Sequence, residues 1–451
     1  MDRQIDRRHF LTQSCLLGLG ATILPSGQAM AAPAKKIRHA CIGVGGMGRA
    51  DFASISSHPD VEVVAICDID TARARDVQKR VPQARFYQDW RELLEKEDID
   101  SVNVSTPDHM HAPITMTALS KGCHVYCQKP LTHDIYEARM IGAKAAETGL
   151  VTQMGTQLTS TMGERIAVEW IRSQAIGRIR EVYLWSNKPP EQYRPKGPRP
   201  ANSDPVPANV DWNGWLGTAA ERPYVKGVYH PTWWRGWQDF GCGWLGDMGC
   251  HIMDMPFRSL GLGMPLSVKA EVEPEWAADP ARRIETFPRW QVVEYVYPGT
   301  DQTTGDTIKL TWSDGGKYPP AGLRKFIDGN EWPQQGVLMI GEDGAMMLVH
   351  SGSPRLFPRE KFAQVRPPKL APQHHYHQFI DAILGKNGGK THSSFPYAAR
   401  ATEMVLMGTI ALRFPGQTLH WQAERMRFTN VPDANQFVRR TYRKGWEVEG
   451  L

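Results

Sequence analysis

Residues 37–50 read IRHACIGVGGMGRA, six mostly apolar residues followed by four closely spaced glycines. The apolar run predicts a short buried strand, and the glycines predict a tight turn into a helix that ends near Ser57. Strand-like and helix-like stretches alternate from here to about Thr148. The expected strands are 61–67, 101–104 and 124–127, and the expected helices are 72–80, 114–121 and 135–148. This alternation predicts an α/β fold with a doubly wound parallel sheet.

The glycines have the spacing of a nucleotide-binding turn. Gly43, Gly45 and Gly48 form G-x-G-x-x-G, and Asp68 follows Gly48 by 20 residues at the end of the next strand. Such glycines allow a tight turn, a close approach of the backbone to a pyrophosphate and helix packing, and the acidic residue binds a ribose. The cofactor-binding residues predicted here are Gly43, Gly45, Gly46, Met47, Gly48 and Asp68. Asp68 favours NAD, while Arg73 and Arg75 leave NADP open.

The pattern changes after about Thr156. A helix is expected over 163–174, followed by strand-like runs at 179–186, 266–272, 291–297, 307–311, 336–340 and 345–349, and late helices at 374–384 and 397–413. We expect no helices between these strands, which predicts a large, mainly antiparallel, open-faced sheet in an α+β domain. The predicted domains are therefore a Rossmann domain at residues 33–156 and a substrate and oligomerisation domain at residues 157–451.

A long segment rich in tryptophan, proline and glycine separates the first two of these strands. This tryptophan-rich segment covers residues 188–243, and six of the 15 tryptophans fall between Trp212 and Trp244. Loops of this length are usually functional, and aromatic rings stack on the apolar faces of sugars. We predict that Tyr229, His230 and Arg235 contact substrate. The alternative is that most of these tryptophans pack in a core or in an interface between subunits.

Two further motifs make the chain recognisable. Residues 106–111 read TPDHMH after the third of the quoted strands, and Gln128-Lys129-Pro130 follows the next strand. The chain resembles the Gfo/Idh/MocA family, whose pattern is T-P-x-x-x-H and then E-K-P, over essentially all of its length from Ile37. The resemblance implies that Thr106, Pro107, His111, Gln128 and Lys129 lie at the cofactor. Gln128 departs from the family's Glu and removes the charge that would steady Lys129.

Asp247 and His251 complete the predicted site. Their spacing of four residues places both on one face of a helix, which alone is more typical of a surface pair. The family resemblance implies instead that they match its D-x-x-x-H pattern and reach substrate hydroxyls. His251 is then the acid and base for a carbinol proton, and Lys129 and Asp247 hold the substrate oxygens. The predicted catalytic residues are Lys129, Asp247 and His251.

The N-terminus is expected to be an export signal. Residues 1–32 contain Arg7-Arg8, an apolar stretch too short to span a bilayer and Ala29-Met30-Ala31, and they resemble a twin-arginine (Tat) signal peptide cleaved after about Ala31. The protein would then be periplasmic or secreted and would engage the Tat machinery. Six cysteines remain, and we expect no disulfide and no metal site, because their positions suit buried strands and lack zinc spacing.

Charge and composition exclude other classes. The net charge of +5 on 451 residues is too small and dispersed for a nucleic-acid partner, and no apolar run is long enough for a membrane span. We expect an exported NAD(P)-dependent oxidoreductase that acts on a sugar, cyclitol or glycoside with tightly bound NAD. One alternative is a redox-neutral NAD-dependent glycosidase that acts through a transient 3-keto sugar, and another is a non-catalytic nucleotide-binding relative. The resemblance also implies a homo-oligomer, a dimer or tetramer.

Overall fold

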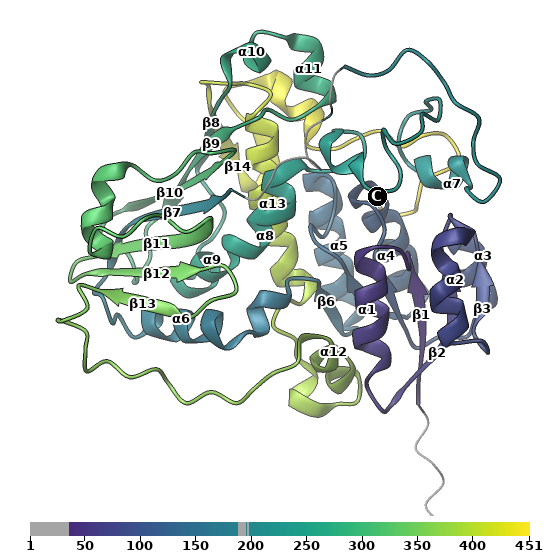
Figure 1. The fold of residues 1–451 in the computed structure, drawn as a ribbon, viewed down its shortest axis with the longest axis horizontal. Coiled ribbons are helices and arrows are strands. Elements are labelled where there is room, and N and C mark those ends of the chain that lie inside the picture. The colour runs from purple at the N-terminus through teal and green to yellow at the C-terminus, as the bar shows by residue number, and fades with distance from the viewer. Residues whose placement is uncertain (1–35, 188–194, 196–197) are drawn as a thin grey trace, which may run out of the picture. The chain divides into compact units, whose positions relative to one another are not determined.

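A parallel six-stranded sheet forms the N-terminal part of the structure (Figure 1). The computed structural model describes residues 36–187, 195 and 198–451, so the predicted export signal lies outside the described residues. In spatial order the strands are β3 (Arg85–Tyr87), β2 (Val61–Cys67), β1 (Ile37–Ile42), β4 (Ser101–Val104), β5 (His124–Cys127) and β6 (Thr152–Met154). The strand order reverses between β1 and β4, where ligands bind in doubly wound sheets.

Helices cover both faces of this sheet. They are α1 (Met47–Ser56), α2 (Thr71–Arg80), α3 (Trp90–Lys96), α4 (His111–Ser120) and α5 (Ile135–Thr148). Local chemistry sets several of their ends: the Asp70 carboxylate caps α2, and α5 begins with a reciprocal Asp134–Glu137 capping box and ends at left-handed Gly149. The predicted α/β fold is confirmed. The sequence prediction missed the short elements β3, α3 and β6.

The second sheet has nine strands and is antiparallel except for the β7–β10 pair. Its strands in spatial order are β13 (Pro354–Phe357), β12 (Ala345–Val349), β11 (Gln335–Gly341), β7 (Ile179–Ser186), β10 (Thr307–Asp314), β9 (Gln291–Pro298), β8 (Ser267–Val272), β14 (Thr418–Gln422) and β15 (Arg427–Phe428). The mainly antiparallel sheet is confirmed. Its outer face is open over β9 and β10, where alternate residues such as Glu294 and Thr311 are half-buried.

The expectation that no helices lie between these strands is wrong. Helices α7 (Trp212–Leu216), α8 (Gly243–Ile252) and α9 (Asp254–Leu260) separate β7 from β8, and α10 (Pro274–Ala277) and α11 (Pro280–Glu285) separate β8 from β9. Helix α8 is the helix expected from the spacing of Asp247 and His251, and it has no amphipathic period because almost every residue in it is buried. The inner face of the sheet packs on α6 (Met162–Arg172), α8 and the late helix α13 (Phe395–Ala411).

The C-terminal segments complete the core of the parallel sheet. Helix α12 (His375–Ile383) contributes Phe379 and Ile380 to the face that α1 covers, while α13 and Trp446 join the opposite face. Helix α13 also packs against α5 and α8 (Figure 1). It therefore connects the parallel sheet to the helix that carries Asp247 and His251.

Other sequence expectations concern cysteines, metals and membranes. All six cysteines in the described ranges are free and buried, four of them in or beside the parallel strands. Residues 36–187, 195 and 198–451 contain no cluster of three or more metal-ligating side chains. In the same ranges, no helix has the length and apolar composition needed to cross a bilayer.

Candidate active site

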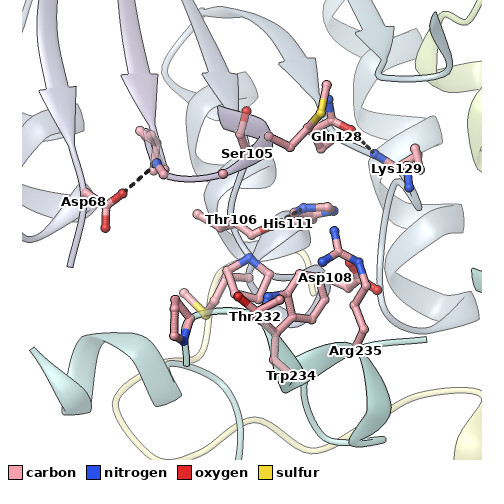
Figure 2. A pocket seen from close by; sticks show the side chains of 18 of the residues that line it. Asp68, Ser105, Thr106, Asp108, His111, Gln128, Lys129, Thr232, Trp234 and Arg235 are labelled. Atoms are coloured by element: carbon pink, nitrogen blue, oxygen red, sulfur yellow. Dashed lines mark hydrogen bonds between the residues drawn. The ribbon is translucent and has the colours of Figure 1, made fainter. Parts of the chain in front are cut away.

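A cavity of about 400 Å³ opens at the carboxyl ends of β1, β2, β4 and β5. The tryptophan-rich segment forms its opposite wall, and Figure 2 shows Thr232, Trp234 and Arg235 facing Ser105, Thr106 and His111. Nearly all the predicted cofactor residues line it: Gly43, Gly45, Gly46, Met47, Asp68, Thr106, Pro107, His111, Gln128 and Lys129. Asp247 and His251 from α8 line the same cavity, so both halves of the predicted site share one space.

The glycine turn is built for close approach. Gly43 has a φ of +80°, which side-chain-bearing residues rarely adopt. Gly48 does not line the cavity, and a Cβ there would lie 1.9 Å from the Gly43 carbonyl oxygen. Its role is therefore to let α1 pack against the turn. Arg73 lies over Gly45 and lines the cavity, whereas Arg75 is exposed and does not.

Asp68 organises this turn from the end of β2. One carboxylate oxygen accepts hydrogen bonds from the Val44 and Gly45 amides at 3.0 and 3.1 Å, and the other accepts one from the Asp70 amide at 3.0 Å. Burial raises the pKa of Asp68, and the backbone hydrogen bonds oppose this shift. Because a carboxylate oxygen can accept more than one hydrogen bond, the side chain can still bind a ribose hydroxyl.

The loop after β4 is tied to the Lys129-Pro130 turn by His111. The two His111 ring nitrogens lie 2.7 Å from the Pro130 carbonyl oxygen and 2.9 Å from that of Thr106. Burial lowers the pKa of His111 to about 4, so the ring is neutral and has one N–H to donate. The Lys129–Pro130 peptide bond is cis. The Thr106 hydroxyl is buried and has no hydrogen-bond partner among the described residues, which suits a polar ligand.

Lys129 and Asp247 meet across the cavity although 118 positions separate them. The Lys129 ammonium pairs with the Asp247 carboxylate and donates to the Asp247 carbonyl oxygen at 3.0 Å. The Arg235 Nε atom lies 3.4 Å from the same carboxylate, and its guanidinium stacks on Trp234. About an eighth of the Asp247 side chain is exposed, so this charged cluster reaches the cavity yet is largely desolvated.

Among the cavity-lining residues that were not predicted are two titratable ones, Asp108 and His350. Asp108 lines the cavity, is buried, and accepts a hydrogen bond from the Cys242 amide at 3.0 Å. Burial raises the pKa of Asp108 to about 7, although the Arg235 and Lys129 charges act in the opposite direction. Its place inside the TPDHMH motif was the available signal. His350, which follows β12, also lines the cavity, with its ring centroid 5.9 Å from that of His251. No sequence pattern pointed to His350.

The tryptophan-rich segment contributes fewer substrate candidates than expected. His230 and Arg235 line the cavity, but Tyr229 does not. The prediction that Tyr229 contacts substrate is therefore wrong in this structure: its ring is 1 % exposed and packs among Trp215, Trp237 and Phe240. Of the six tryptophans, Trp215 and Trp234 line the cavity. Trp212 and Trp237 pack in the segment's own core, and Trp244 packs under the antiparallel sheet.

The residues present fit a dinucleotide. The glycine turn presents backbone amides at the start of α1, Asp68 stands at the ribose position, and the unpartnered Thr106 hydroxyl lies between that end and Lys129. The cavity is continuous from the glycine turn to His251. A nicotinamide held by such a turn would therefore meet the Lys129–Asp247 pair.

Comparison with known proteins identifies the family. A profile described as an oxidoreductase family with an NAD-binding Rossmann fold matches residues 37–156, and a profile for that family's C-terminal α/β domain matches residues 192–306. The two matches together span just over half of the chain. The chain belongs to the Gfo/Idh/MocA oxidoreductase family. The resemblance inferred from the motifs is thereby confirmed.

Curated proteins match parts of this chain. A levoglucosan dehydrogenase of Pseudarthrobacter phenanthrenivorans is 29% identical over 162 residues, which are 33% of this chain and 41% of that protein. A glycosyl hydrolase family 109 protein of Stenotrophomonas maltophilia is 35% identical over 133 residues, 27% of this chain and 29% of that one. The matched regions span less than half of either relative.

Solved structures share the fold over most of the chain. The WlbA dehydrogenase from Bordetella pertussis, in complex with NADH and UDP-GlcNAcA, has a TM-score of 0.60 at 16% identity and covers 86% of this chain and 98% of its own. The myo-inositol 2-dehydrogenase from Lactobacillus plantarum has a TM-score of 0.55 at 15% identity, covering 86% and 100%. At these identities the likeness shows the shared architecture of both sheets.

Proposed function

We propose that this protein is an NAD(H)-dependent oxidoreductase that transfers hydride at a ring carbinol of a sugar, cyclitol or glycoside. One observation carries the proposal: a single cavity joins the glycine turn of an NAD-binding Rossmann domain to Lys129, Asp247 and His251. Asp68 favours NAD over NADP because a carboxylate at the ribose repels a 2′-phosphate.

Residues of this chain transfer the carbinol proton and orient the substrate. NAD supplies the hydride acceptor when bound. The His251 imidazole accepts the carbinol proton as the hydride leaves the same carbon, and it returns the proton in the reverse direction. The Lys129 ammonium donates a hydrogen bond to the substrate oxygen and stabilises the negative charge that develops there. Asp247 holds that ammonium in place and, with Arg235, binds neighbouring hydroxyls.

The substrate class is inferred from the opposite wall and from relatives. Trp215 and Trp234 present aromatic surface in the cavity, with His230 and Arg235 as polar neighbours. Flat apolar surface with a polar rim suits a pyranose or cyclitol ring. Two relatives are named levoglucosan dehydrogenase and inositol 2-dehydrogenase, and the substrates in these names contain such rings.

The first experiment releases and identifies the nucleotide. The purified protein is denatured, and NAD(H) and NADP(H) in the supernatant are quantified per chain. We expect close to one NAD(H) per chain, followed by NADH formation when cyclic polyols are added to enzyme reconstituted with NAD. A protein that releases no nucleotide and binds no added NADH would contradict the proposal and favour a non-catalytic relative.

A redox-neutral glycosidase is the second candidate, and Asp108 is the observation that favours it. A carboxyl with a pKa of about 7 in the cavity can carry the proton that a departing glycosidic oxygen requires. In that cycle the carbinol is oxidised to a 3-keto sugar, the acidified C2 proton is removed, and the aglycone leaves by elimination. Water then adds and the ketone is reduced, so no net redox change occurs. Family 109 glycosyl hydrolases are among the relatives.

Aryl glycosides separate the two candidates. Release of nitrophenol from a nitrophenyl glycoside without net NADH formation, with exchange of the C2 proton for solvent deuterium, would establish the glycosidase. Accumulation of NADH in proportion to the sugar oxidised would establish the dehydrogenase.

We also propose that the protein is exported by the Tat pathway, carries its cofactor out, and assembles as a dimer or tetramer. A bound cofactor would have to be recycled in the site, since the periplasm holds no free NAD pool. Fractionation of cells that express the wild type or Arg7→Lys/Arg8→Lys tests export, and light scattering of the purified protein tests assembly. The open outer face over β9 and β10 is the surface we assign to the oligomer.

A further inference from the structure

A buried carboxylate lies behind the Lys129 turn, outside the cavity. Asp51 is on α1, one turn after the glycines, and is fully buried. It accepts hydrogen bonds from Gln128 Nε2 to both oxygens at 2.9 and 3.0 Å, from the Ser105 hydroxyl at 2.6 Å, and from the Tyr376 hydroxyl at 2.9 Å. These donors are all neutral, and they come from the residue that follows β5, the loop after β4 and α12.

The arrangement suits an ionised carboxylate. All four hydrogen bonds point toward Asp51, and a proton on the carboxyl would have to compete with one of these donors. Hydrogen bonds from several donors stabilise the charged form of a buried acid. Burial raises the pKa of Asp51, and the hydrogen bonds from Ser105, Gln128 and Tyr376 and the Lys129 charge oppose this shift. The four hydrogen bonds and the Lys129 charge are the features that favour a buried negative charge on Asp51.

Gln128 connects this carboxylate to the lysine. Its amide nitrogen donates to Asp51, and its amide oxygen accepts from the Lys129 backbone N–H at 3.3 Å. A Cβ at Gly155 would lie 2.7 Å from the Gln128 side chain, so the amide is closely confined. Glutamate at position 128 would lack both N–H donors of the amide. It would also bring a second carboxylate to about 3 Å from Asp51, where ionisation of both groups is unfavourable because the like charges repel.

We propose that Asp51 supplies, from helix α1, the negative charge that the E-K-P pattern carries on the residue before the lysine, and that it acts through Gln128 as a positioning residue for Lys129. Glutamine at position 128 then does not remove the negative charge behind the lysine, because Asp51 on helix α1 carries that charge instead. Each arrangement holds one carboxylate and one hydrogen-bonding partner behind the lysine. The inference rests on the role given to Lys129 in the proposed function.

Exchange of the two side chains tests the inference. The variants are Asp51→Asn, Gln128→Glu and the double exchange Asp51→Asn/Gln128→Glu, which restores a carboxylate–amide pair with the partners reversed. Glu164→Gln, which changes a buried carboxyl of α6 beside Asp254, is the control for replacing a buried carboxyl by an amide elsewhere in the fold.

The first measurement is independent of activity. Acetic anhydride labels amines in their neutral form, and peptide mass spectrometry follows the labelling of Lys129 relative to exposed Lys309 at fixed pH. We expect Asp51→Asn to label Lys129 about threefold to tenfold faster, because the turn that holds Lys129 against Asp247 loses part of the hydrogen-bond network behind it. The double exchange should return to within about twofold of wild type, and Glu164→Gln should match wild type. Equal labelling in Asp51→Asn and wild type would overturn the inference, as would a double exchange that labels like Asp51→Asn.

The second measurement remains informative if Asp51→Asn does not fold. In Gln128→Glu, a second carboxyl must ionise beside Asp51, so we expect its melting temperature to fall relative to wild type as pH rises from 5 to 8. The double exchange should remove this extra pH dependence. An unchanged pH dependence in Gln128→Glu would overturn the inference. Failure of wild type to bind NADH would instead contradict the proposed function, so the two failures are distinguishable.

Discussion

His230 in the tryptophan-rich segment lies 3.0 Å from Asp70, at the start of α2, although 160 positions separate them. The other oxygen of Asp70 accepts from the Asn209 side chain at 2.6 Å. Backbone hydrogen bonds from Thr71 to Asn209 and from Asp211 to Ile69 continue the contact. These hydrogen bonds hold the tryptophan-rich segment against the end of the cavity that Asp68 lines.

Loosening this contact should speed nucleotide release. Asn209 does not line the cavity. Asn209→Ala removes a hydrogen bond to a carboxylate, worth about 1.5–3 kcal/mol, so we expect bound NADH to dissociate about tenfold faster. Displacement of NADH by excess NAD, followed by fluorescence, measures the rate. Asn430→Ala, which loses hydrogen bonds in the distant β14–β15 hairpin, is the control. Identical NADH release from wild type and Asn209→Ala would show that the segment does not retain the nucleotide.

Removing the Lys129 ammonium should affect turnover more than binding. Lys129→Met keeps the length of the side chain but leaves Asp247 and Arg235 without the cation. We expect kcat to fall by about 100-fold or more, because stabilisation of the developing oxygen charge is lost. The Kd for NADH should stay within about threefold. Lys309→Met, which breaks an exposed pair with Glu294, is the matched control. A kcat near wild type would remove Lys129 from the mechanism.

Ionisation of Asp108 should weaken the fold toward neutral pH. Since the pKa of Asp108 is raised to about 7 in the folded protein, the native state holds a proton that the unfolded state releases above about pH 4. This contribution to stability is present at low pH and is lost as pH rises to about 7, by at most about 4 kcal/mol. Denaturant unfolding of Asp108→Asn between pH 4.5 and 8 should lack this decline. Asp306→Asn on an exposed turn serves as control, and parallel curves for wild type and Asp108→Asn would refute the assignment.

Acid should destabilise the parallel sheet through a buried histidine. His39 in β1 contacts the Ser101 hydroxyl at 2.8 Å and the Asn103 side chain at 3.0 Å, and burial lowers its pKa to about 4. The unfolded state binds a proton near pH 6.5, so the stability contributed by neutral His39 is lost as pH falls from 6.5 to about 4, by about 3 kcal/mol.

Unfolding of His39→Gln at pH 7 and pH 4.5 measures this effect. The variant should show a smaller loss of stability on acidification than wild type. His420→Gln, on the partly exposed strand β14, controls for removal of a histidine without burial. Equal losses in wild type and His39→Gln would mean that His39 does not carry the acid sensitivity.

Local patterns were sufficient for most of the parallel sheet. Strands β1, β4 and β5 and helix α5 fall within a residue of their predicted bounds, because apolar runs and caps are short-range signals. Elements of three residues, such as β3 and β6, carry too little periodicity to be recognised. Helix α8 was expected only from the spacing of Asp247 and His251, because burial on all sides removed its amphipathic period.

At the site, sequence motifs identified residues whose positions follow a pattern along the chain. The side chains that these residues contact could be learned only from the folded structure. Gly43 and Asp68 were found because they belong to a spacing that dinucleotide binding requires, and Lys129, Asp247 and His251 were found through the family resemblance of their motifs. Tyr229 and His230 are adjacent in sequence, yet one is enclosed by aromatic rings and the other lines the cavity. Composition cannot show which of two adjacent residues faces the cavity, because the direction of a side chain in a long loop depends on what the loop packs against.

The sequence by itself determined the family, the fold class and the dinucleotide turn, because these follow from interactions between residues close along the chain. The tertiary structure decided that Asp108 and His350 join the cavity, that Asp70 fastens the tryptophan-rich segment, and that Asp51 stands behind Gln128. Each of these depends on contacts across tens to hundreds of positions. Burial and electrostatic coupling between such residues arise only when the chain has folded, so no local pattern encodes them.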